Sequence, residues 1–243
     1  MSKDIIIIPD VHGRTYWKDA IRGRENNDII FLGDYLDPYP LENIDKEFAI
    51  TNFEEIIEFK KAHMDNVTLL LGNHDFMTYI SQEMGSCRTD FLNAGKIANI
   101  FYINRDLFKL GTTREVNGVK YSFTHAPILK MWVEDPYNEK YFKDVKDPGH
   151  VIRILQKLYD TKDAGLYKLL NQVSWCRGGY NDAGSSVWAD VRECPKETPL
   201  YDGWYEIFGH TQLITEIIEP NFADLDCRAG FILNSDGVLQ KIQ

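Results

Sequence analysis

The sequence predicts an α/β protein built on a parallel sheet, and three largely apolar runs are the main reason. Residues 5–8 are four consecutive isoleucines, which is typical of a strand that is buried on both faces in the middle of a sheet. Residues 29–32 and 67–71 form two more such runs. Each run ends in a short polar loop, so we expect parallel strands whose carboxyl-terminal loops converge at one edge of the sheet.

The first half of the chain also contains helical patterns. Helices are expected over residues 15–24 and 44–63, and Phe48 is among the residues of the second helix that should face the sheet. Residues 76–115 have helical spacing only in parts, with a polar break at Gly85. A lid or cap over the site is one interpretation of that segment.

The second half of the chain alternates strands with a helical insertion. A hairpin is expected over residues 116–123, closed by Asn117-Gly118, and a strand over residues 204–208. Between them, roughly residues 130–175 have a composition and spacing that predict an inserted helical segment beside the site. The tail, residues 213–243, is expected to be a meander of short strands.

Size, charge and cysteine content limit the class of protein. A chain of 243 residues with 44% hydrophobic content can bury one α/β core, so we expect a single domain over residues 1–243. The net charge of −10 argues against a general nucleic-acid or membrane surface. The four cysteines are far apart, which argues against a zinc knuckle or a disulfide framework. Without a membrane-spanning run or a cleavable leader, the protein is expected to be cytoplasmic, and its oligomeric state is not predicted.

Polar residues of the kind that bind metals recur at the ends of predicted strands. Asp10 and His12 follow the first apolar run, where a carboxylate and an imidazole can face one cation. That pair alone is better explained by a helix-capping Asp and a His that binds a carbonyl group. The recurrence of the pattern after later strands favours a metal site instead. The further strand-end residues are Asp34, Asp37, Asn73, His74, His125 and His210.

These side chains fit two cation sites that share one carboxylate. Asp10, His12 and Asp34 can hold the first metal, and the second oxygen of Asp34 can bridge to another. The mixed nitrogen and oxygen donors suit Mn, Fe, Zn, Co or Ni without choosing among them. We expect two such divalent or transition metal ions, with Mn favoured. The ligands that would complete the second site are Asn73, His125 and His210.

The strand-end residues lie in five ordered motifs: Asp10-x-His12, Gly33-Asp34-x-x-Asp37, Gly72-Asn73-His74-Asp75, Thr124-His125-Ala126 and Gly209-His210-Thr211. Together these motifs resemble the signature of the calcineurin-like metallophosphoesterases, over residues 10–211. The most similar branch is the phage and bacterial type of serine/threonine protein phosphatase. The resemblance implies a four-layer sandwich of two mixed β-sheets flanked by helices.

The resemblance also implies roles for two residues that would not bind metal. His74 would protonate the leaving-group oxygen, and Asp37 would orient His74 and raise its pKa, as general acid catalysis requires. A hydroxide held by the metals would attack the phosphorus atom.

The chain departs from the family pattern at the arginines that bind phosphate. Pro38 follows Asp37 where the family usually has an arginine, and Asp190 stands where a second one is usual. Arg177 and Arg192 are the expected substrate-binding replacements, because a guanidinium group matches the geometry of a phosphate.

The expected activity is the hydrolysis of a phosphate monoester, with phosphoserine or phosphothreonine in a protein as one substrate. A second hypothesis keeps the site but makes the substrate a dinucleoside polyphosphate or another nucleotide. A third is a weakly active metal-binding scaffold that recognises a partner. The complete ligand set and His74 favour an enzyme, since a binding module needs no leaving-group acid. The expected partner is therefore a phosphorylated protein or a small phosphoester.

Overall fold

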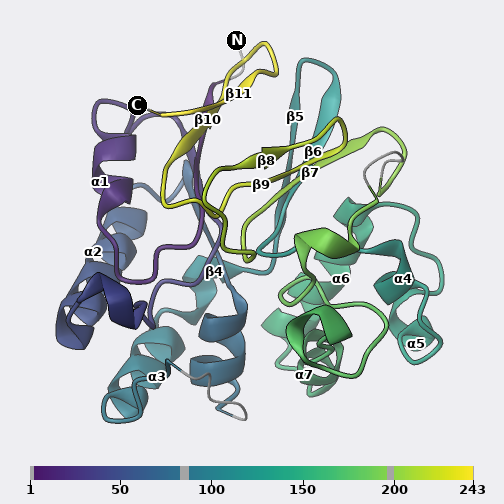
Figure 1. The fold of residues 1–243 in the computed structure, drawn as a ribbon, viewed down its shortest axis with the longest axis horizontal. Helices are drawn as coiled ribbons and strands as arrows, with labels where there is room; N and C mark the ends of the chain where they lie inside the picture. The colour runs from purple at the N-terminus through teal and green to yellow at the C-terminus, as the bar shows by residue number, and fades with distance from the viewer. Residues whose placement is uncertain (1–2, 83–87, 196–199, 243) are drawn as a thin grey trace. The chain divides into compact units, whose positions relative to one another are not determined.

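The computed structural model describes residues 3–82, 88–195 and 200–242, and the chain forms two compact units. Unit 1 comprises Met1–Lys109 and Arg228–Gln243, and unit 2 comprises Leu110–Cys227. Each unit contains one mixed β-sheet with helices packed against it (Figure 1). The prediction of two mixed sheets flanked by helices is confirmed. The single domain over residues 1–243 stays a prediction.

The sheet of unit 1 is built around β1 (Ile5–Ile8) and has the order β11-β10-β1-β2-β3-β4. β1 pairs in parallel with β2 (Asp28–Phe31) and antiparallel with β10 (Phe231–Leu233). Its four isoleucines are at most 2% exposed, so both faces of the strand are covered, as predicted. The other strands are β3 (Val67–Leu70), β4 (Phe108–Lys109) and β11 (Leu239–Lys241).

The helices of unit 1 connect its parallel strands. α1 (Tyr16–Ile21) packs on β1, and α2 (Lys46–Ala62) packs on β3. α3 (Ala94–Ile103) packs on a π-helix (His74–Ile80) that follows β3. Because β1, β2 and β3 run parallel, their carboxyl ends meet at one edge of the sheet, and the loops with the predicted ligands begin there.

The first turn of α2 shows why one prediction fails. Asp45 caps the helix, since its carboxylate accepts a hydrogen bond from the backbone amide of Phe48 at 3.0 Å. The buried stripe of the helix begins one residue later, at Ala49, and continues through Phe53 and Ile56. Phe48 is 49% exposed, so the expectation that it faces the sheet is wrong. Neighbouring helical residues point about 100° apart, which turns Phe48 to the edge of the stripe.

The sheet of unit 2 has the order β5-β6-β7-β9-β8. β5 (Thr112–Val116) and β6 (Val119–Phe123) form the predicted hairpin, although its first strand begins earlier than expected. Asn117 and Gly118 close it with positive φ angles of 49° and 78°, as a type I′ turn requires. β7 (Trp204–Phe208) pairs in parallel with both β6 and β9. The remaining strands are β8 (Ile217–Ile218) and β9 (Phe222–Asp224).

The predicted helical insertion lies between β6 and β7. Its longest helix is α6 (Pro148–Asp160), which starts with Asp147 as the cap and packs on β5. Val151 and Leu155 are fully buried on its apolar face. The shorter helices of the insertion are α4 (Lys130–Val133), α5 (Glu139–Phe142) and α7 (Gly165–Leu170).

The C-terminal tail is shared between the two sheets, so the expectation of one meander is wrong. β8 and β9 pair antiparallel in the sheet of unit 2, whereas β10 and β11 pair antiparallel in the sheet of unit 1. Short apolar strands show which side chains are buried, but they do not show which neighbouring strand they pair with.

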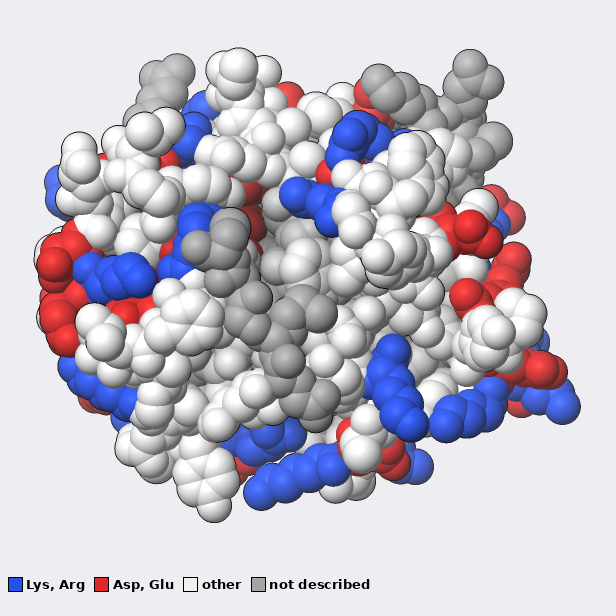
Figure 2. Space-filling model, turned by 60° about the horizontal axis from the view of Figure 1, so that its bottom comes forward, with Lys and Arg blue, Asp and Glu red and all other residues white. Residues whose placement is uncertain are grey.

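Membrane-spanning character and surface charge are the remaining general features. No helix among the described residues is long and apolar enough to cross a bilayer. On the face drawn in Figure 2, Lys and Arg side chains stand next to Asp and Glu side chains and form no broad basic surface. Cys176 and Cys194 carry free thiols, whereas Gly85 and Cys87 lie outside the described residues.

Candidate active site

Three loops of unit 1 bring six of the predicted site residues to one edge of the sheet. The backbone amide of His12 donates to the carbonyl oxygen of Asp34 at 2.7 Å, and the amide of His74 donates to the Asp34 carboxylate at 2.9 Å. All six are at most 7% exposed. They are Asp10 and His12 after β1, Asp34 and Asp37 after β2, and Asn73 and His74 after β3.

Asp10, His12 and Asp34 form a candidate metal-binding group. One possible ligand atom from each lies within 4.8 Å of the others. Nδ1 of His12 donates to the carbonyl oxygen of Leu36 at 2.7 Å, which leaves the lone pair on Nε2. Nε2 is 3.6 Å from Oδ2 of Asp34. That distance is long for a hydrogen bond and suits two donors that face one cation.

The electrostatics of this group also fit a cation. Burial raises the pKa of Asp34 well above its usual range, and the carboxylates of Asp75 and Asp10 contribute to that rise. Burial has the opposite effect on His12, because it disfavours the protonated imidazole and lowers the pKa. The imidazole of His12 is therefore neutral and able to bind a metal. A divalent cation would neutralise the buried carboxylates that otherwise repel one another. The side chains of Asp10, His12 and Asp34 therefore fit a bound metal.

The backbone of these loops is held in a conformation that side chains rarely adopt. His12, Asp34 and Asp37 have φ angles of 45°, 53° and 59°. A left-handed residue other than glycine costs about 1–2 kcal/mol, so surrounding contacts must hold the loops in place. Asp75 supplies some of these contacts, because its buried carboxylate accepts from the amides of Gly72 at 2.9 Å and Tyr35 at 3.2 Å.

His74 is paired with Asp37, as the leaving-group hypothesis requires. Nδ1 of His74 lies 2.6 Å from Oδ2 of Asp37. Burial disfavours ionisation of Asp37, but the hydrogen bond and charge of His74 and the hydroxyl of Tyr79 hold the pKa of Asp37 below its usual value. An ionised Asp37 keeps a proton on Nδ1 of His74 and fixes the ring, so that Nε2 is the atom able to exchange a proton.

Tyr79 is a site residue that the sequence reasoning missed. Its hydroxyl donates to the second oxygen of Asp37. His74 and Tyr79 are five residues apart, which in an α-helix would place them on different faces. They lie in a π-helix, where Ser81 donates to the carbonyl of Phe76 five residues earlier, at 2.8 Å. The wider turn brings residues at this spacing onto one face, so both reach Asp37.

Arg88 is a second site residue without a sequence signal. Nη2 of its guanidinium donates to Nε2 of His74 at 3.0 Å. It belongs to none of the five motifs, and only the folded chain brings it to His74.

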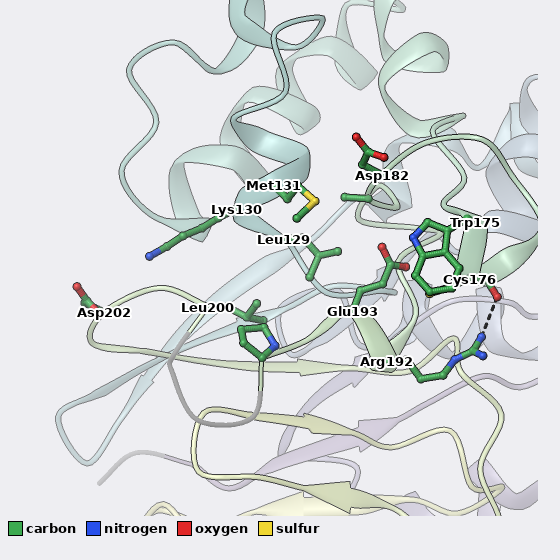
Figure 3. Close-up of a pocket in the computed structure, with 12 residues that line it drawn as sticks. Leu129, Lys130, Met131, Trp175, Cys176, Asp182, Arg192, Glu193, Leu200 and Asp202 are labelled. Atoms are coloured by element: carbon green, nitrogen blue, oxygen red, sulfur yellow. Dashed lines mark hydrogen bonds between the residues drawn. The ribbon is translucent and has the colours of Figure 1, made fainter.

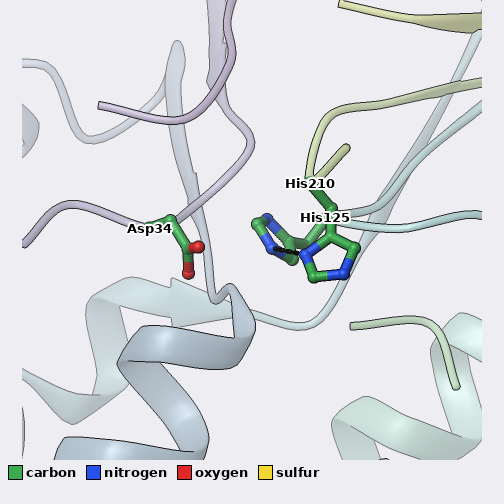
Figure 4. A group of neighbouring side chains, drawn as sticks. All are labelled: Asp34, His125 and His210. Atoms are coloured by element: carbon green, nitrogen blue, oxygen red, sulfur yellow. Dashed lines mark hydrogen bonds between the residues drawn. The ribbon is translucent and has the colours of Figure 1, made fainter. Parts of the chain in front are cut away.

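Unit 2 holds the other two predicted ligands, at the ends of parallel strands. His125 follows β6 and His210 follows β7, and the amide of Gly209 donates to the carbonyl of His125 at 2.9 Å. Nε2 of His125 and Nδ1 of His210 are 3.1 Å apart, and the two rings meet edge-on (Figure 4). His210 has a φ angle of 72°, so it too is held in a left-handed conformation.

Asp190 binds both arginines that were expected to contact substrate. Nε of Arg177 lies 3.1 Å from Oδ2 of Asp190, and Arg192 donates from Nε to Oδ1 at 2.8 Å and from Nη2 to Oδ2 at 3.0 Å. These contacts hold the pKa of Asp190 below its usual value despite its burial. Arg177 also donates to the carbonyl of His210 at 2.9 Å, so it lies next to a predicted ligand.

Unit 2 also contains a pocket of about 710 Å³ beside Arg192 (Figure 3). Leu129, Met131 and Leu200 contribute apolar walls, and Trp175 lines it with a side chain that is 71% exposed. Acidic side chains (Asp182, Glu193 and Asp202) and basic ones (Lys130 and Arg192) also line it, so the apolar walls and the accessible indole ring suit a ligand with a flat apolar part, without a clear preference for its charge.

The calcineurin-like phosphoesterase family matches residues 4–212 of the chain. Among solved structures, the chain is similar to a protein serine/threonine phosphatase from Saccharomyces cerevisiae with similarity to human phosphatase PP5. The two share 12% identity with a TM-score of 0.57, and the match covers 100% of this chain and 80% of that one. At this identity the likeness shows the fold alone. No match was found among curated proteins.

Proposed function

The chain belongs to the calcineurin-like phosphoesterase family, and on this premise we propose that it hydrolyses phosphate monoesters at a two-metal centre. Family membership makes it a metal-dependent phosphoesterase. The class of ester is our proposal. It rests on one observation, that His74 is paired with Asp37 next to the group formed by Asp10, His12 and Asp34. An alkoxide leaving group needs an acid, and this pair supplies one next to candidate metal ligands.

The proposed metal ligands follow the two groups of donors. Asp10, His12 and Asp34 would hold one cation, and Asp34 would also contribute to the other. When bound, two cations would polarise the phosphoryl oxygens and lower the pKa of water. We propose Mn, with Fe, Zn, Co and Ni as alternatives, because the donors are nitrogen and oxygen atoms only. The remaining ligands in this proposal are Asn73, His125 and His210.

The chain's own residues supply the proton transfer. Asp37 remains ionised and holds the Nδ1 proton of His74, so the ring presents Nε2 to the substrate. His74 then gives a proton from Nε2 to the departing oxygen, and the imidazolium that precedes this step is stabilised by Asp37. Tyr79 keeps Asp37 in position through its second oxygen.

The proposed substrate is a phosphorylated serine or threonine in a protein, hydrolysed in the cytoplasm. A nucleotide, such as a dinucleoside polyphosphate, is the second candidate, and the exposed Trp175 beside Arg192 in the unit 2 pocket favours it. An indole ring can stack on a base while the guanidinium binds a phosphate. In either case Arg177 and Arg192 are proposed substrate-binding residues.

The test is hydrolysis by purified protein that has been stripped of metal and then supplied with Mn. The substrates are an aryl monoester, a bis-aryl diester, a phosphoserine peptide and diadenosine tetraphosphate. We expect metal-dependent turnover that falls about 10²- to 10⁴-fold in His74→Asn, whereas His63→Asn, outside the site, stays at the wild-type rate. Asp34→Asn should lose metal-dependent turnover as well.

The preferred ester decides between the substrates. Faster turnover of the phosphopeptide supports the protein phosphatase, and faster turnover of diadenosine tetraphosphate supports the nucleotide hydrolase. If metal binds but no ester is hydrolysed with Mn, Zn, Fe, Co or Ni, the proposal is wrong and a metal-binding scaffold replaces it.

A further inference from the structure

Arg88 lies at the atom of His74 that the substrate must approach. Nη2 of Arg88 is 3.0 Å from Nε2 of His74, while the other ring nitrogen is already paired with Asp37. In the proposed reaction, Nε2 faces the oxygen that leaves from phosphorus. A guanidinium beside Nε2 is therefore within reach of the phosphoryl oxygens of a bound monoester.

Tyr39 provides a surface that holds the Arg88 guanidinium. The central carbon of the guanidinium lies 3.6 Å from the centroid of the Tyr39 ring. The same ring meets the imidazole of His12 edge-on, with the centroids 5.1 Å apart. Tyr39 therefore contacts both the candidate metal ligand His12 and Arg88, and it helps to hold the positive charge near the candidate metal ligands. A contact of this kind contributes about 0.5–2 kcal/mol.

The backbone that follows Arg88 is also fixed to the site. Lys46 of α2 donates to the carbonyl of Thr89 at 3.3 Å. The amide of Asp90 donates to the hydroxyl of Tyr79 at 3.3 Å, and Asp90 is only 5% exposed. The hydroxyl that holds Asp37 thus also holds the segment from which Arg88 extends.

A second arginine near Tyr39 is engaged elsewhere. Arg14 lies 5.2 Å from the ring centroid, but it donates from Nε and Nη2 to the two oxygens of Glu42 at 2.7 and 2.9 Å. Arg14 also donates from Nη1 to the carbonyl of Asp10 at 3.2 Å, so the guanidinium has partners at Glu42 and Asp10. Of the two arginines, Arg88 is the one that contacts the His74 ring.

Resting on the proposed function, we infer that Arg88 binds the phosphoryl group of the substrate monoester, in addition to the proposed substrate-binding residues Arg177 and Arg192. In the structure its Nη2 donates to Nε2 of His74, and on binding it exchanges that acceptor for phosphoryl oxygens. The planar guanidinium can donate two hydrogen bonds to two oxygens of a phosphate. Its contact with the face of the Tyr39 ring fixes the orientation of that plane. The ligand class is a dianionic phosphate, either as a monoester or as the inorganic phosphate product.

The experiment measures the binding of inorganic phosphate to the metal-loaded protein, by calorimetry and as inhibition of aryl monoester hydrolysis. Arg88→Met keeps the length of the side chain without its charge, and we expect about 30-fold weaker phosphate binding with a comparable rise in KM. Arg88→Lys keeps the positive charge without the guanidinium fork, so its phosphate affinity should fall less than that of Arg88→Met. Arg22→Met, at an arginine whose side chain is 77% exposed, is the matched control and should bind phosphate as the wild type does.

Variants of Tyr39 test the contact between its ring and Arg88 without changing the charge of Arg88. Tyr39→Leu removes the ring face and should weaken phosphate binding several-fold, whereas Tyr39→Phe keeps it and should not. Melting temperatures of all variants show which of them are folded, and only folded variants enter the comparison.

Two outcomes would overturn the inference. One is unchanged phosphate affinity in a folded Arg88→Met variant. The other is an equal fall in kcat for the monoester and the diester while phosphate affinity stays unchanged. In that case Arg88 would only position His74 and would not bind the phosphoryl group. Failure of the proposed function looks different, because the wild type would then hydrolyse no monoester while calorimetry would still report whether Arg88 binds phosphate.

Discussion

The carboxylate of Asp75 holds the backbone of Asp34, since Oδ2 of Asp75 accepts a hydrogen bond from the Asp34 amide at 2.7 Å. Asp34 is in a left-handed conformation with a φ angle of 53°, and the fully buried carboxylate of Asp75 accepts from its amide as well as from the amides of Gly72 and Tyr35. The loops that follow β2 and β3 are thus joined by an acidic residue outside the set of proposed metal ligands. We therefore expect the geometry of the candidate Asp10, His12 and Asp34 group to depend on this contact.

Asp75→Asn should therefore weaken metal binding without removing a ligand. The amide group lacks one acceptor and the charge, so we expect about 2–3 kcal/mol lower stability and about 10- to 100-fold weaker metal affinity. Urea unfolding and metal titration measure the two effects. Asp65→Asn, at an exposed aspartate, is the control. Wild-type metal affinity in a folded Asp75→Asn protein would show that Asp75 does not position Asp34.

Gly72→Ala should disturb the candidate metal-binding group of Asp10, His12 and Asp34, because the added methyl group would crowd Asp34. A Cβ at Gly72 would overlap the carboxylate of Asp34, whereas a Cβ at Gly95 in α3 would meet nothing within 4 Å. The first substitution should lower both the Tm and the metal affinity. Gly95→Ala, the same chemical change in a helix, should leave metal affinity alone and stabilise the protein by up to about 1 kcal/mol. Equal effects of the two alanines on metal affinity would contradict the crowding argument.

Asp34→Asn should act in opposite directions with and without metal. In the metal-free protein the buried Asp34 carboxylate has a raised pKa, so its ionisation destabilises the fold as the pH rises. The amide removes this charge and its oxygen still accepts from His74. We expect a higher Tm than the wild type in EDTA at pH 7, and a smaller rise in Tm when Mn is added. A lower Tm of Asp34→Asn in EDTA would show that the carboxylate charge is compensated without metal.

The parts of the fold that the sequence predicted are those that depend on local pattern. The run Ile5–Ile8 forms β1 because only a central strand buries every residue, and Asn117-Gly118 closes a hairpin because both residues tolerate a positive φ angle. The loops after β1, β2 and β3 meet because parallel strands end at the same edge.

The parts that the sequence did not predict depend on contacts between distant residues or on unusual helix geometry. Tyr79 reaches Asp37 only because the helix after β3 is a π-helix, and apolar spacing gives no sign of that widening. Arg88 reaches His74 through contacts that fix Thr89 and Asp90. Likewise, no local pattern assigns β10 to the sheet of unit 1 and β9 to that of unit 2.

Tyr79→Phe tests the missed contact directly. Loss of the hydroxyl removes a donor from the ionised Asp37, so we expect about 1.5–3 kcal/mol lower stability near neutral pH. Catalysis should fall less than in Asp37→Asn, because the pairing of Asp37 with His74 remains. Urea unfolding and kcat report the two effects, with Tyr180→Phe, at a fully exposed tyrosine, as the control. An unchanged unfolding midpoint would mean that the Tyr79 hydroxyl adds nothing to the folded state.

Glu206 on β7 gives a prediction about pH. It is 1% exposed, its Oε2 accepts from the amide of Ile128 at 2.9 Å, and burial raises its pKa from 4.5 to about 8. Between these two values the folded protein keeps a proton that the unfolded chain has lost. The stability that Glu206 contributes is therefore fully present below pH 4.5, falls as the pH rises, and is lost above pH 8.

Glu206→Gln removes this titration and keeps an oxygen that can accept from Ile128. The variant should gain stability relative to the wild type as the pH rises from 5 to 8, by up to about 1.4 kcal/mol per pH unit, with no further gain above pH 8. Urea unfolding at pH 5, 6.5, 8 and 9 measures the difference, and taking it against the wild type cancels the titration of the metal-binding residues. Glu139→Gln, at an exposed glutamate, should give curves parallel to the wild type. Parallel curves for Glu206→Gln as well would mean that Glu206 is already ionised in the folded protein, because a group that titrates alike in both states makes no contribution that depends on pH.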